Sequence, residues 1–432
     1  MIVPTRRPRL ALIAFTAQPG QGSEYEVGWR WALLAARVAR PVVLTRRACW
    51  DAIPARGRCV DGQRLKRSHG ALFVAVDVPG APRLFPGRRL MRSHYLVWQV
   101  LVLAWLLRRR GCFALVHHVT FVAAWFPPFA AFAGLPFVWG PIGTNPPMPE
   151  FYRARLKPVD RLRATLRTFV TQSLVRYNPV LPLVARRCTV AFAITEHVRG
   201  LLPTALRERT RVHPAIGIAD DWFEVASANR TRNDTMLFVG RAMDIKLPRL
   251  AYRVMRSVIA QRPQASGVMI GEGLPAMLAR EPASIGVELR EHIPQDRLRG
   301  LYRDAGLLLF PSVEASGFVT LEALANGLPV ACIEGFGAAA FAGSAGPLVV
   351  SADGGWDAVH DRLVEAIVAY LDDPASHAAA AAQARLRAHD FAWESYEPFL
   401  KEVYGPVLAC ADATDQITTN RSGIAHPQKV IP

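Results

Sequence analysis

Long apolar runs and cysteine pairs are both missing from this sequence of 432 residues. No stretch of about 18 uncharged apolar residues occurs, so no membrane-spanning helix is expected. The longest apolar stretch, residues 95–107, is shorter and ends in Arg108, Arg109 and Arg110. The six cysteines form no C-x-x-C pair, which argues against a zinc site or a disulfide framework and suits a reducing cytoplasm.

Charge is abundant but unevenly placed. Of the 52 Lys and Arg and 35 Asp and Glu residues, 33 and 12 lie within the first 225 positions, which gives this part +21 and the remainder −4. A strongly basic first half indicates an anionic partner there: membrane phospholipid, a phosphorylated acceptor or nucleic acid. The hydrophobic content of 51% indicates a globular chain with sizeable cores.

Short β-rich runs alternate with helical stretches along the whole chain. Such alternation predicts parallel sheets wrapped by helices, here an α/β fold of two doubly wound, Rossmann-like domains facing across a cleft. The predicted strands are residues 10–15, 41–45, 71–77, 113–118, 136–140 and 190–195, then 235–240, 267–271, 286–289, 306–311, 328–333 and 348–351.

The predicted domains are residues 1–220 on the acceptor side and 221–390 on the nucleotide side. Residues 391–410 are expected to form a helix that packs back on the first domain, and the polar residues 411–432 a disordered tail. The basic and apolar N-terminus could pass for a signal peptide. We interpret residues 10–15 as a first strand, because a glycine turn and a helix follow.

The segment from Pro311 to Val330 carries the sharpest functional signal. A buried strand ends at Pro311, and a helix is expected from about Gly317 to Asn326, with Gly327 after it. The amides of Gly317, Phe318 and Val319 would then open a helix N-terminus that suits a phosphate. Glu314 precedes this turn and Glu322 follows it, so each could accept hydrogen bonds from hydroxyls on either side of a bound diphosphate.

A second signal follows the strand at 235–240. Gly240 ends that strand, and two cations, Arg241 and Lys246, come directly after it. Arginine suits bidentate phosphate contacts, and lysine supplies a point charge. By spacing alone, Glu314 and Glu322 would better fit a surface acid and a solvated helix residue, but the strand-loop-helix context favours a functional site. A solvated basic loop is the alternative for Arg241 and Lys246.

Together these segments resemble the family 4 retaining glycosyltransferases of the GT-B fold. The resemblance implies that Glu314 contacts the transferred sugar, that Glu322 holds the ribose hydroxyls, and that the Gly240-Arg241 turn and Lys246 bind the donor diphosphate. Ser316 and Leu247 depart from it, because the family usually has an aromatic residue and a glycine there. The resemblance covers residues 11–404.

The sequence contains no Asp-x-Asp pair, which usually signals a metal holding a sugar nucleotide. We therefore expect no metal and no bound cofactor, with the nucleotide sugar acting as co-substrate and the two cations and the helix N-terminus neutralising its diphosphate.

In the first half, the glycine loop at 19–22 resembles the loop of the same family that closes over the donor phosphates, and Gly22 is its candidate residue. A plain structural turn fits equally well. Ser23 and Glu26 predict a capping box for the next helix. The family also has a histidine facing the transferred sugar. His117 or His118 matches it, and we favour His118.

Residues 83–110 combine arginines with apolar and aromatic residues. Two interpretations fit: a helix lying in a membrane interface, or an ordinary core helix with a charged end. With a second basic stretch at 153–187, the composition suggests a peripheral protein at an anionic, cytoplasmic membrane face that reaches a lipid-linked acceptor.

The sequence thus predicts a cytoplasmic enzyme that transfers a sugar from a nucleotide donor to a lipid-linked or glycan acceptor, without nucleic acid as a partner. Two alternatives stay open. One is a sugar-nucleotide epimerase of the same fold, and the other is a non-enzymatic protein whose basic half binds membranes or nucleic acid.

Overall fold

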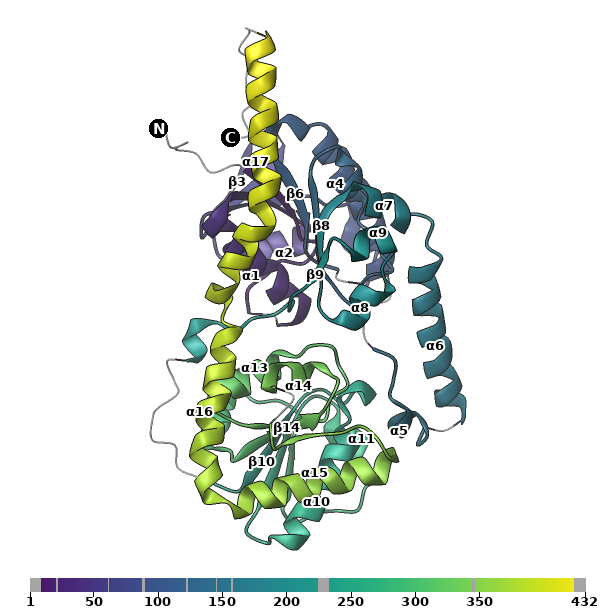
Figure 1. The fold of residues 1–432 in the computed structure, drawn as a ribbon, viewed down its shortest axis with the longest axis vertical. Helices are drawn as coiled ribbons and strands as arrows, with labels where there is room; N and C mark the ends of the chain where they lie inside the picture. The colour runs from purple at the N-terminus through teal and green to yellow at the C-terminus, as the bar shows by residue number, and fades with distance from the viewer. Residues whose placement is uncertain are drawn as a thin grey trace. The chain divides into compact units, whose positions relative to one another are not determined.

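The computed structural model describes residues 9–20, 22–60, 62–87, 90–121, 123–144, 146–156, 158–223, 233–343 and 346–422. These residues form two compact units, each built on its own sheet (Figure 1). The first unit comprises residues 9–144, 171–215 and 396–422, and the second comprises 146–170 and 216–395. The division at 215 lies near the boundary predicted at 220, but the excursion of 146–170 into the second unit was not predicted.

The first unit contains a nine-stranded sheet in the order β3-β4-β5-β2-β1-β6-β7-β8-β9. The bounds are β1 Arg9–Ile13, β2 Arg40–Thr45, β3 Gly57–Val60, β4 Gln63–Ser68, β5 Ala71–Ala75, β6 Leu115–His118, β7 Phe137–Ile142, β8 Cys188–Ala193 and β9 Thr210–Val212. The strands from β5 to β9 pair in parallel, and β3 and β4 add an antiparallel hairpin. Leu10 to Ile13 have no exposed surface, as expected for a parallel strand covered on both faces.

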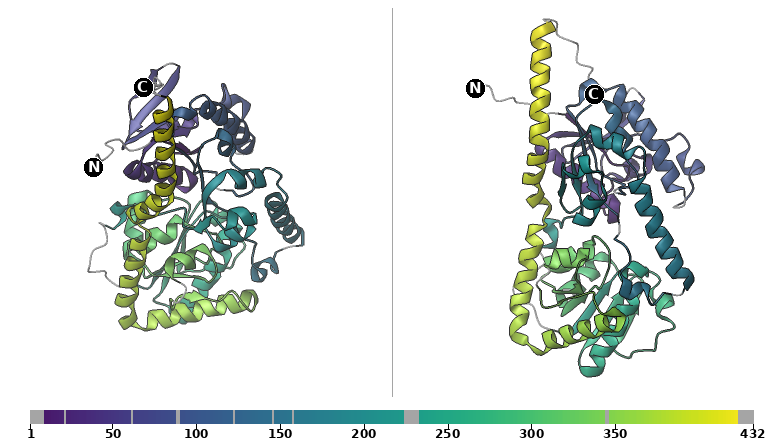
Figure 2. Two further views of the ribbon diagram at one scale, coloured as in Figure 1. Left: turned by 45° about the horizontal axis from the view of Figure 1, so that its top comes forward. Right: turned by 45° about the vertical axis from the view of Figure 1, so that its right-hand side comes forward.

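Helices flank this sheet, and the last helix of the chain returns to it (Figure 2). The helices are α1 Ser23–Val38, α2 Arg47–Ala52, α3 Ala81–Leu84, α4 Met91–Leu107, α7 Leu181–Arg187, α8 Glu196–Leu201, α9 Thr204–Arg207 and α17 Glu397–Ser422. Helix α17 packs against α1. It continues past residue 410 to Ser422, so the first part of the predicted disordered tail is helical, while residues 423–432 lie outside the described chain.

The second unit has a six-stranded, fully parallel sheet in the order β12-β11-β10-β13-β14-β15. Its strands are β10 Thr235–Val239, β11 Ser266–Ile270, β12 Val287–Arg290, β13 Leu307–Leu309, β14 Val330–Ile333 and β15 Val349–Val350. Its helices are α5 Glu150–Arg153, α10 Pro248–Gln261, α11 Leu274–Leu278, α12 Gln295–Asp304, α13 Phe318–Ala325, α14 Gly337–Ala342, α15 Gly355–Asp372 and α16 Pro374–Asp390. Helices α10 and α15 pack together, as do α13, α14 and α16.

Helix α6, Pro158–Arg176, crosses the division between the units, which falls between Val170 and Thr171. Every predicted strand overlaps an observed one, and β3, β4 and β9 were not predicted. Their sequences lack the continuous apolar runs that mark the buried strands: β3 and β9 each have exposed residues, and β4 carries Arg64, Lys66 and Arg67.

The structure bears on two local expectations for the first unit, the capping box and the helix within residues 83–110. The capping box is wrong: Gly22 is the N-cap of α1, Ser23 is its first residue, and Glu26 accepts a hydrogen bond from the Gly20 amide at 2.9 Å. Helix α4 buries one apolar face, as a core helix does, yet it also exposes an apolar stripe. Of the arginines that end it, Arg109 lies over the Trp105 ring at 4.6 Å and so supports the fold. Two further arginines of that basic segment, at positions 88 and 89, lie outside the described residues.

Candidate functional site

The strand order of the second unit places two loops side by side. Counted along the chain within this unit, the order is 3-2-1-4-5-6, and it reverses between β10 and β13. In open parallel sheets, ligands bind outside the carboxyl ends of the strands at such a reversal. The loops that follow β10 and β13 there are residues 240–246 and 310–317, which are the two segments that the sequence singled out.

A half-buried ion pair joins these loops. Nζ of Lys246 lies 2.7 Å from Oε2 of Glu314, and both side chains are mostly covered, with 13% and 21% of their surfaces exposed. The Ser312 hydroxyl donates to the same oxygen at 3.1 Å. The Lys246 ammonium also lies 5.0 Å from the centre of the Phe310 ring. The proposed diphosphate cation and the proposed sugar-binding carboxylate are therefore in direct contact.

Helix α13 begins beside this pair. Gly317 is its N-cap, and a Cβ built on Gly317 would lie 3.9 Å from Oε2 of Glu314. The amides of Gly317, Phe318 and Val319 lie at the start of the helix, where no preceding turn supplies an acceptor. The predicted helix boundaries are confirmed: α13 ends at its C-cap Asn326, and Gly327 has the left-handed φ of 67°. The helix start thus offers backbone donors next to the half-buried lysine.

Glu322 lies one turn into α13, and it keeps only a small exposed surface. The Tyr302 hydroxyl donates to Oε2 of Glu322 at 3.0 Å. Burial raises the pKa of the Glu322 carboxyl to about 7, while the Tyr302 hydrogen bond and the charge of Arg299 act in the opposite direction. A hydroxyl-rich ligand would supply the further hydrogen bonds that the carboxylate form lacks.

The turn after β10 fits tightly against the turn after β11. A Cβ on Gly271 would lie 1.9 Å from the Gly240 carbonyl oxygen, and one on Gly240 would lie 2.7 Å from Cδ of Lys246. Neither position therefore has room for a side chain. Arg241 follows at the rim, exposed and without an ion pair to any described residue. The structure thus brings Gly240, Lys246, Glu314 and Gly317 together, with Arg241 beside them.

Three contacts that the sequence did not reveal support these loops. Tyr152 of α5 donates to Oδ1 of Asp244 at 2.9 Å, which ties the loop of Lys246 to a segment far away in the chain. Gly337, which begins α14, has its Cβ position 2.5 Å from the backbone of Ala315, so this loop rests directly on α14. The third is the Tyr302 hydroxyl on Glu322. Each of these contacts depends on tertiary packing, so no local sequence pattern predicts it.

Gly22 and His118, the other predicted site residues, belong to the first unit. Gly22 has a left-handed φ of 60° and is exposed at the start of α1, so the loop needs glycine there. Gly28, one turn and a half later, has its Cβ position 1.9 Å from the Thr16 carbonyl oxygen. Helix α1 therefore packs directly on the turn after β1, as the helix of a nucleotide-binding Rossmann turn does.

His117 and His118 end β6 at the carboxyl edge of that sheet, and both are buried. Nε2 of His117 donates to the Gly140 carbonyl at 2.8 Å, so Nδ1 accepts from the Tyr404 hydroxyl at 2.6 Å. Both ring nitrogens of His117 are thus used by the fold. His118 contacts the Tyr95 hydroxyl through Nε2 at 2.9 Å. Burial lowers the pKa of each histidine to about 3, so both rings are neutral at physiological pH.

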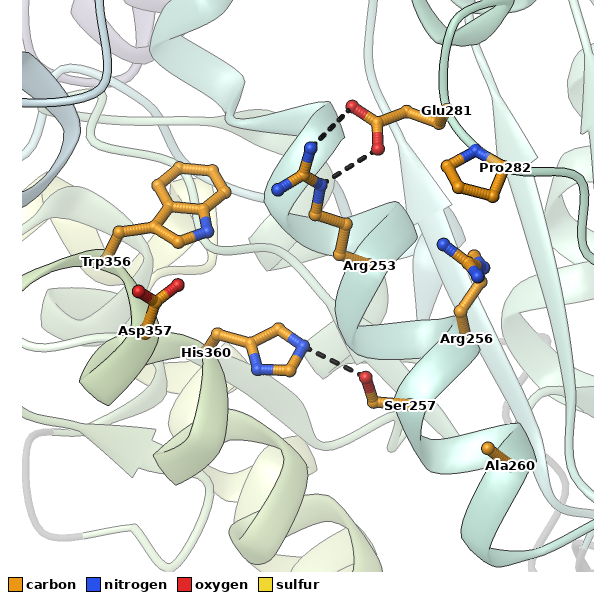
Figure 3. Close-up of a pocket in the computed structure, with 9 residues that line it drawn as sticks. All are labelled: Arg253, Arg256, Ser257, Ala260, Glu281, Pro282, Trp356, Asp357 and His360. Atoms are coloured by element: carbon orange, nitrogen blue, oxygen red, sulfur yellow. Dashed lines mark hydrogen bonds and ion pairs between the residues drawn. The ribbon is translucent and has the colours of Figure 1, made fainter.

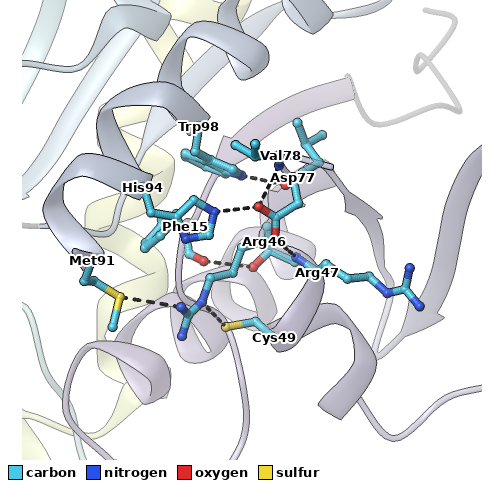
Figure 4. Close-up of polar contacts among 11 residues, drawn as sticks. Phe15, Arg46, Arg47, Cys49, Asp77, Val78, Met91, His94 and Trp98 are labelled. Atoms are coloured by element: carbon cyan, nitrogen blue, oxygen red, sulfur yellow. Dashed lines mark hydrogen bonds and ion pairs between the residues drawn. The ribbon is translucent and has the colours of Figure 1, made fainter. Parts of the chain in front are cut away.

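A half-buried arginine stands at the same edge of the first sheet (Figure 4). Arg46 follows β2, and its guanidinium donates to the Tyr25 hydroxyl at 2.6 Å, to Sγ of Cys49 at 3.3 Å and to Sδ of Met91 at 3.5 Å. None of these acceptors is a carboxylate.

The nearby carboxylate is already engaged. Asp77 accepts hydrogen bonds from Nε2 of His94 at 2.6 Å and from the amides of Arg47 and Val78 at 2.8 Å. These contacts hold the pKa of Asp77 below its usual value, although burial opposes them. The Arg46 charge therefore lacks a hydrogen-bonded counter-ion among the described residues.

A hollow of about 410 Å³ lies between the outer faces of α10 and α15 (Figure 3). Ser257 is 3.1 Å from Nε2 of His360, whose Nδ1 is 2.8 Å from Asp361, the hydrogen-bond order of a nucleophile, a base and an acid. Ser257 lies inside α10, where the amides bond within the helix, so no oxyanion donors flank it. We assign no chemistry to this hollow. Within the part of the chain that the structure describes, no group of three or more His, Cys, Asp or Glu could hold a metal ion.

Comparison with known families and curated proteins gives the following matches. Residues 233–373 match the family described as Glycosyl transferases group 1. The chain is similar to the D-inositol 3-phosphate glycosyltransferase of Thermobispora bispora, with 34% identity over 204 residues, 43% of this chain and 46% of the relative. The protein of the same name from Rhodococcus opacus is 35% identical over 188 residues, 40% of this chain and 41% of the relative. The chain thus spans less than half the length of these curated relatives.

Solved structures match almost the whole chain. Sucrose-phosphate synthase from Thermosynechococcus elongatus is 17% identical with a TM-score of 0.62, covering 94% of this chain and 100% of that one. α,α-Trehalose 6-phosphate synthase from Burkholderia multivorans is 13% identical with a TM-score of 0.63, covering 95% and 99%. HepE from Anabaena, in complex with UDP and glucose, is 14% identical with a TM-score of 0.57, covering 92% and 100%. At these identities the likeness concerns the fold, and it confirms the two-sheet architecture predicted from the sequence.

Proposed function

Since residues 233–373 of this GT-B chain form a group 1 glycosyltransferase segment, we propose that the protein transfers a sugar from a nucleotide-sugar donor to a lipid-linked or polysaccharide acceptor. The proposal includes retention at the anomeric carbon, which follows from the resemblance to family 4. It also includes a role in making cell-envelope or extracellular polysaccharide, without nucleic acid as a partner.

One observation carries this proposal: Lys246, Glu314 and the start of α13 meet at the point where the strand order of the second sheet reverses. A diphosphate needs cations and amide donors, and a sugar needs a carboxylate that accepts from hydroxyls. The two loops supply a cation and a carboxylate in direct contact with each other, since Lys246 pairs with Glu314. The names of the structural relatives, one of which is in complex with UDP and glucose, agree with a nucleotide-sugar donor.

In this proposal the leaving diphosphate is neutralised by Arg241, Lys246 and the amides of Gly317 to Val319. These groups are fixed before the reaction, so they stabilise the negative charge that develops on the leaving group without reorganisation. Glu322 accepts the ribose hydroxyls and Glu314 a hydroxyl of the transferred sugar. His118 and Gly22 remain the candidate residues of the first unit, and no metal is required in this proposal.

The acceptor belongs to the basic first unit. Arg46 supports an acceptor with an anionic group, because a half-buried guanidinium held by a hydroxyl and two sulfur atoms gains much from a phosphate or carboxylate. A lipid-linked acceptor joined through phosphate supplies such a group. Peripheral association with an anionic, cytoplasmic membrane face is part of the same proposal. Among the described helices, none is long and apolar enough to cross a bilayer.

A screen of nucleotide sugars tests the proposal. Purified protein is incubated with each nucleotide sugar, and release of the nucleoside diphosphate is followed with and without a membrane lipid extract. We expect one donor to be hydrolysed slowly alone and faster with the extract, and both rates to fall in Glu314→Gln. Conversion of a donor to its epimer without acceptor would identify an epimerase instead. Failure to bind any nucleotide sugar would contradict the enzyme assignment.

A further inference from the structure

Helix α6 is amphipathic, but its polar face lies against the protein and its apolar face is exposed. Its side chains that lie against the protein are mostly small or polar: Ala164, Thr168, Thr171 and Gln172 are partly covered, and Val175 alone is buried. A helix of a soluble globular protein normally directs its apolar stripe inward. Here the polar stripe faces inward, so the apolar residues of α6 serve something other than the core.

Those apolar residues form a continuous exposed stripe. Large side chains recur at intervals of three and four residues, the spacing that lines up one face of a helix. The stripe consists of Val159, Leu162, Leu166, Phe169, Val170 and Leu174 and extends to Tyr177, just after the helix. Leu162 and Phe169 are 68% and 67% exposed and Tyr177 is 79% exposed, so the stripe is open along its length.

Arginines border the stripe. At about 100° per residue, Arg167 lies on one flank of the stripe and Arg176 on the other. Arg163 lies next to the first flank, between Val170 and Leu174, and pairs at 3.4 Å with Asp160, the single acidic residue of the helix. Arg161 instead turns back to α5, where it donates to the carbonyl groups of Arg153 and Ala154 at 3.2 and 2.7 Å. The start of α6 is thereby held to the folded chain while its apolar stripe stays open.

From this pattern we infer that α6 is a membrane-docking helix, which lies in the plane of an anionic bilayer with Leu162, Leu166 and Phe169 among the acyl chains. Apolar residues between basic flanks are the arrangement by which helices bind bilayer interfaces, since the apolar side chains leave water and the arginines reach lipid phosphates. The inference deepens the proposed membrane association and is independent of the donor site.

A second copy of the chain fits the stripe less well. Pairing two α6 helices about a two-fold axis would place their arginine-bordered faces against each other, and like charges across an interface are unfavourable. The chain as a whole carries +17, which also opposes self-association and favours an anionic surface. Charge complementarity therefore selects phospholipid as the occupant.

Helix α4 provides the matched comparison. It too exposes apolar side chains, Leu96, Val97 and Val100, but its other face is occupied by core residues such as Tyr95 and Trp98. Its apolar surface is thus the outer side of a core helix. If exposure of apolar surface near arginines were sufficient, α4 and α6 would contribute equally to membrane binding.

The test uses the full chain and sedimentation with vesicles of phosphatidylcholine alone or mixed with phosphatidylglycerol. Wild-type protein should sediment with the mixed vesicles, and Leu162→Ser/Leu166→Ser/Phe169→Ser should lower the partition coefficient by at least about tenfold, because three apolar side chains no longer leave water. The control Leu96→Ser/Val97→Ser/Val100→Ser should bind as wild type does. Hydrogen exchange should show that α6 amides become protected when the mixed vesicles are added.

Nucleotide-sugar titration, run on the same variants, separates this inference from the proposed enzyme function. The α6 variant should keep wild-type donor affinity, because its substitutions lie outside the loops of Lys246 and Glu314. Equal vesicle binding by the wild type and the α6 variant, or a greater loss in the α4 variant, would overturn the assignment to α6. So would a wild-type dimer in solution that the α6 substitutions dissociate, since a second copy would then cover the stripe.

Discussion

The Tyr302 hydroxyl donates a hydrogen bond of 3.0 Å to Glu322, the carboxyl group whose burial brings its pKa to about 7. A ligand that offers two ribose hydroxyls needs this group as a carboxylate, because both hydroxyls donate. Binding of the nucleotide must therefore compete with protonation near neutral pH.

Donor affinity should accordingly depend on pH. Below about pH 7 the free protein holds a proton on Glu322, and binding must expel it, so the dissociation constant should rise up to about tenfold per pH unit as pH falls. The dependence should level off above pH 7 and vanish in Glu322→Gln. Calorimetric titration with an intact nucleotide sugar, whose diphosphate does not titrate in this range, measures it. A flat profile in the wild type would mean that Glu322 does not contact the donor.

The same substitution should stabilise the free protein at higher pH. The folded-state pKa of Glu322 is raised above its unfolded value of 4.5, so the wild type loses stability as pH rises from 4.5 to 7 and ionisation takes place in a buried site. Glu322→Gln removes that charge. Its melting temperature relative to the wild type should therefore increase through this window, and a constant difference from pH 4 to pH 8 would contradict the burial of the carboxylate.

Removing the half-buried Lys246 ammonium should weaken donor binding. Lys246→Met deletes the cation next to Glu314, and a hydrogen bond to a charged group contributes about 1.5–3 kcal/mol, which corresponds to a loss of roughly 10- to 150-fold in affinity. Lys401→Met is the matched control, because Lys401 pairs with Glu397 at 2.8 Å on an exposed face of α17. Equal donor affinities for both variants would remove Lys246 from the site.

Metal removal should leave the reaction intact. The groups proposed to neutralise the diphosphate are side-chain cations and amides, so transfer measured in excess EDTA should match transfer in buffer alone. Activity that disappears with EDTA and returns with Mg²⁺ or Mn²⁺ would show that the neutralisation needs a metal.

The neighbouring histidines should respond differently to substitution. His117→Asn breaks two hydrogen bonds of a buried ring, so it should lower the melting temperature. His118→Asn should reduce kcat more than it reduces stability if this side chain faces the sugar. Since burial holds the pKa of His118 near 3, its role should not titrate between pH 6 and pH 8. A kcat that falls only in His117→Asn would reverse the assignment.

Arg46 should matter for the acceptor and not for the donor. Arg46→Gln removes the half-buried guanidinium and should raise the acceptor KM at least about tenfold when the acceptor carries a phosphate, while donor affinity stays unchanged. Arg47→Gln is the control, because Arg47 pairs with Asp51 at 2.8 Å on the surface. An unchanged acceptor KM in Arg46→Gln would show that the acceptor anion, if it has one, binds elsewhere.

Much of the second unit could be predicted from its sequence because local patterns define it. The apolar run before Pro311, the glycine after Asn326 and the spacing of Glu314 and Glu322 specify a strand, a loop and a helix without reference to distant residues. Tyr302 could not be found this way, since only packing brings α12 beside α13. The need for glycine at position 271 could not be predicted either, since its contact with Gly240 exists only when the two loops lie together.

The exposed faces of α4 and α6 were harder to predict for a related reason. A basic, apolar stretch in a sequence does not reveal which side of a helix is covered. The basic stretches 83–110 and 153–187 were both predicted to contribute to a membrane-facing surface, but α4 buries Tyr95 and Trp98 in the core, while α6 turns Leu162 and Phe169 outward. The burial of each side chain distinguishes the core helix α4 from the exposed helix α6, and burial cannot be read from the sequence.

The hydrogen bond between His117 and Tyr404 joins residues 287 positions apart, both within the first unit. Chains are synthesised from the N-terminus, so α17, which packs on α1 and carries Tyr404, leaves the ribosome after the strands of both sheets. The unit that is begun first is therefore the last to be completed, and until then the ring of His117 lacks one of its partners. All residues of the second unit, which ends at Ser395, are synthesised before α17. The second unit can therefore fold while the first unit still lacks α17. A stop codon shortly after residue 395 would thus damage the half of the protein that was translated earliest.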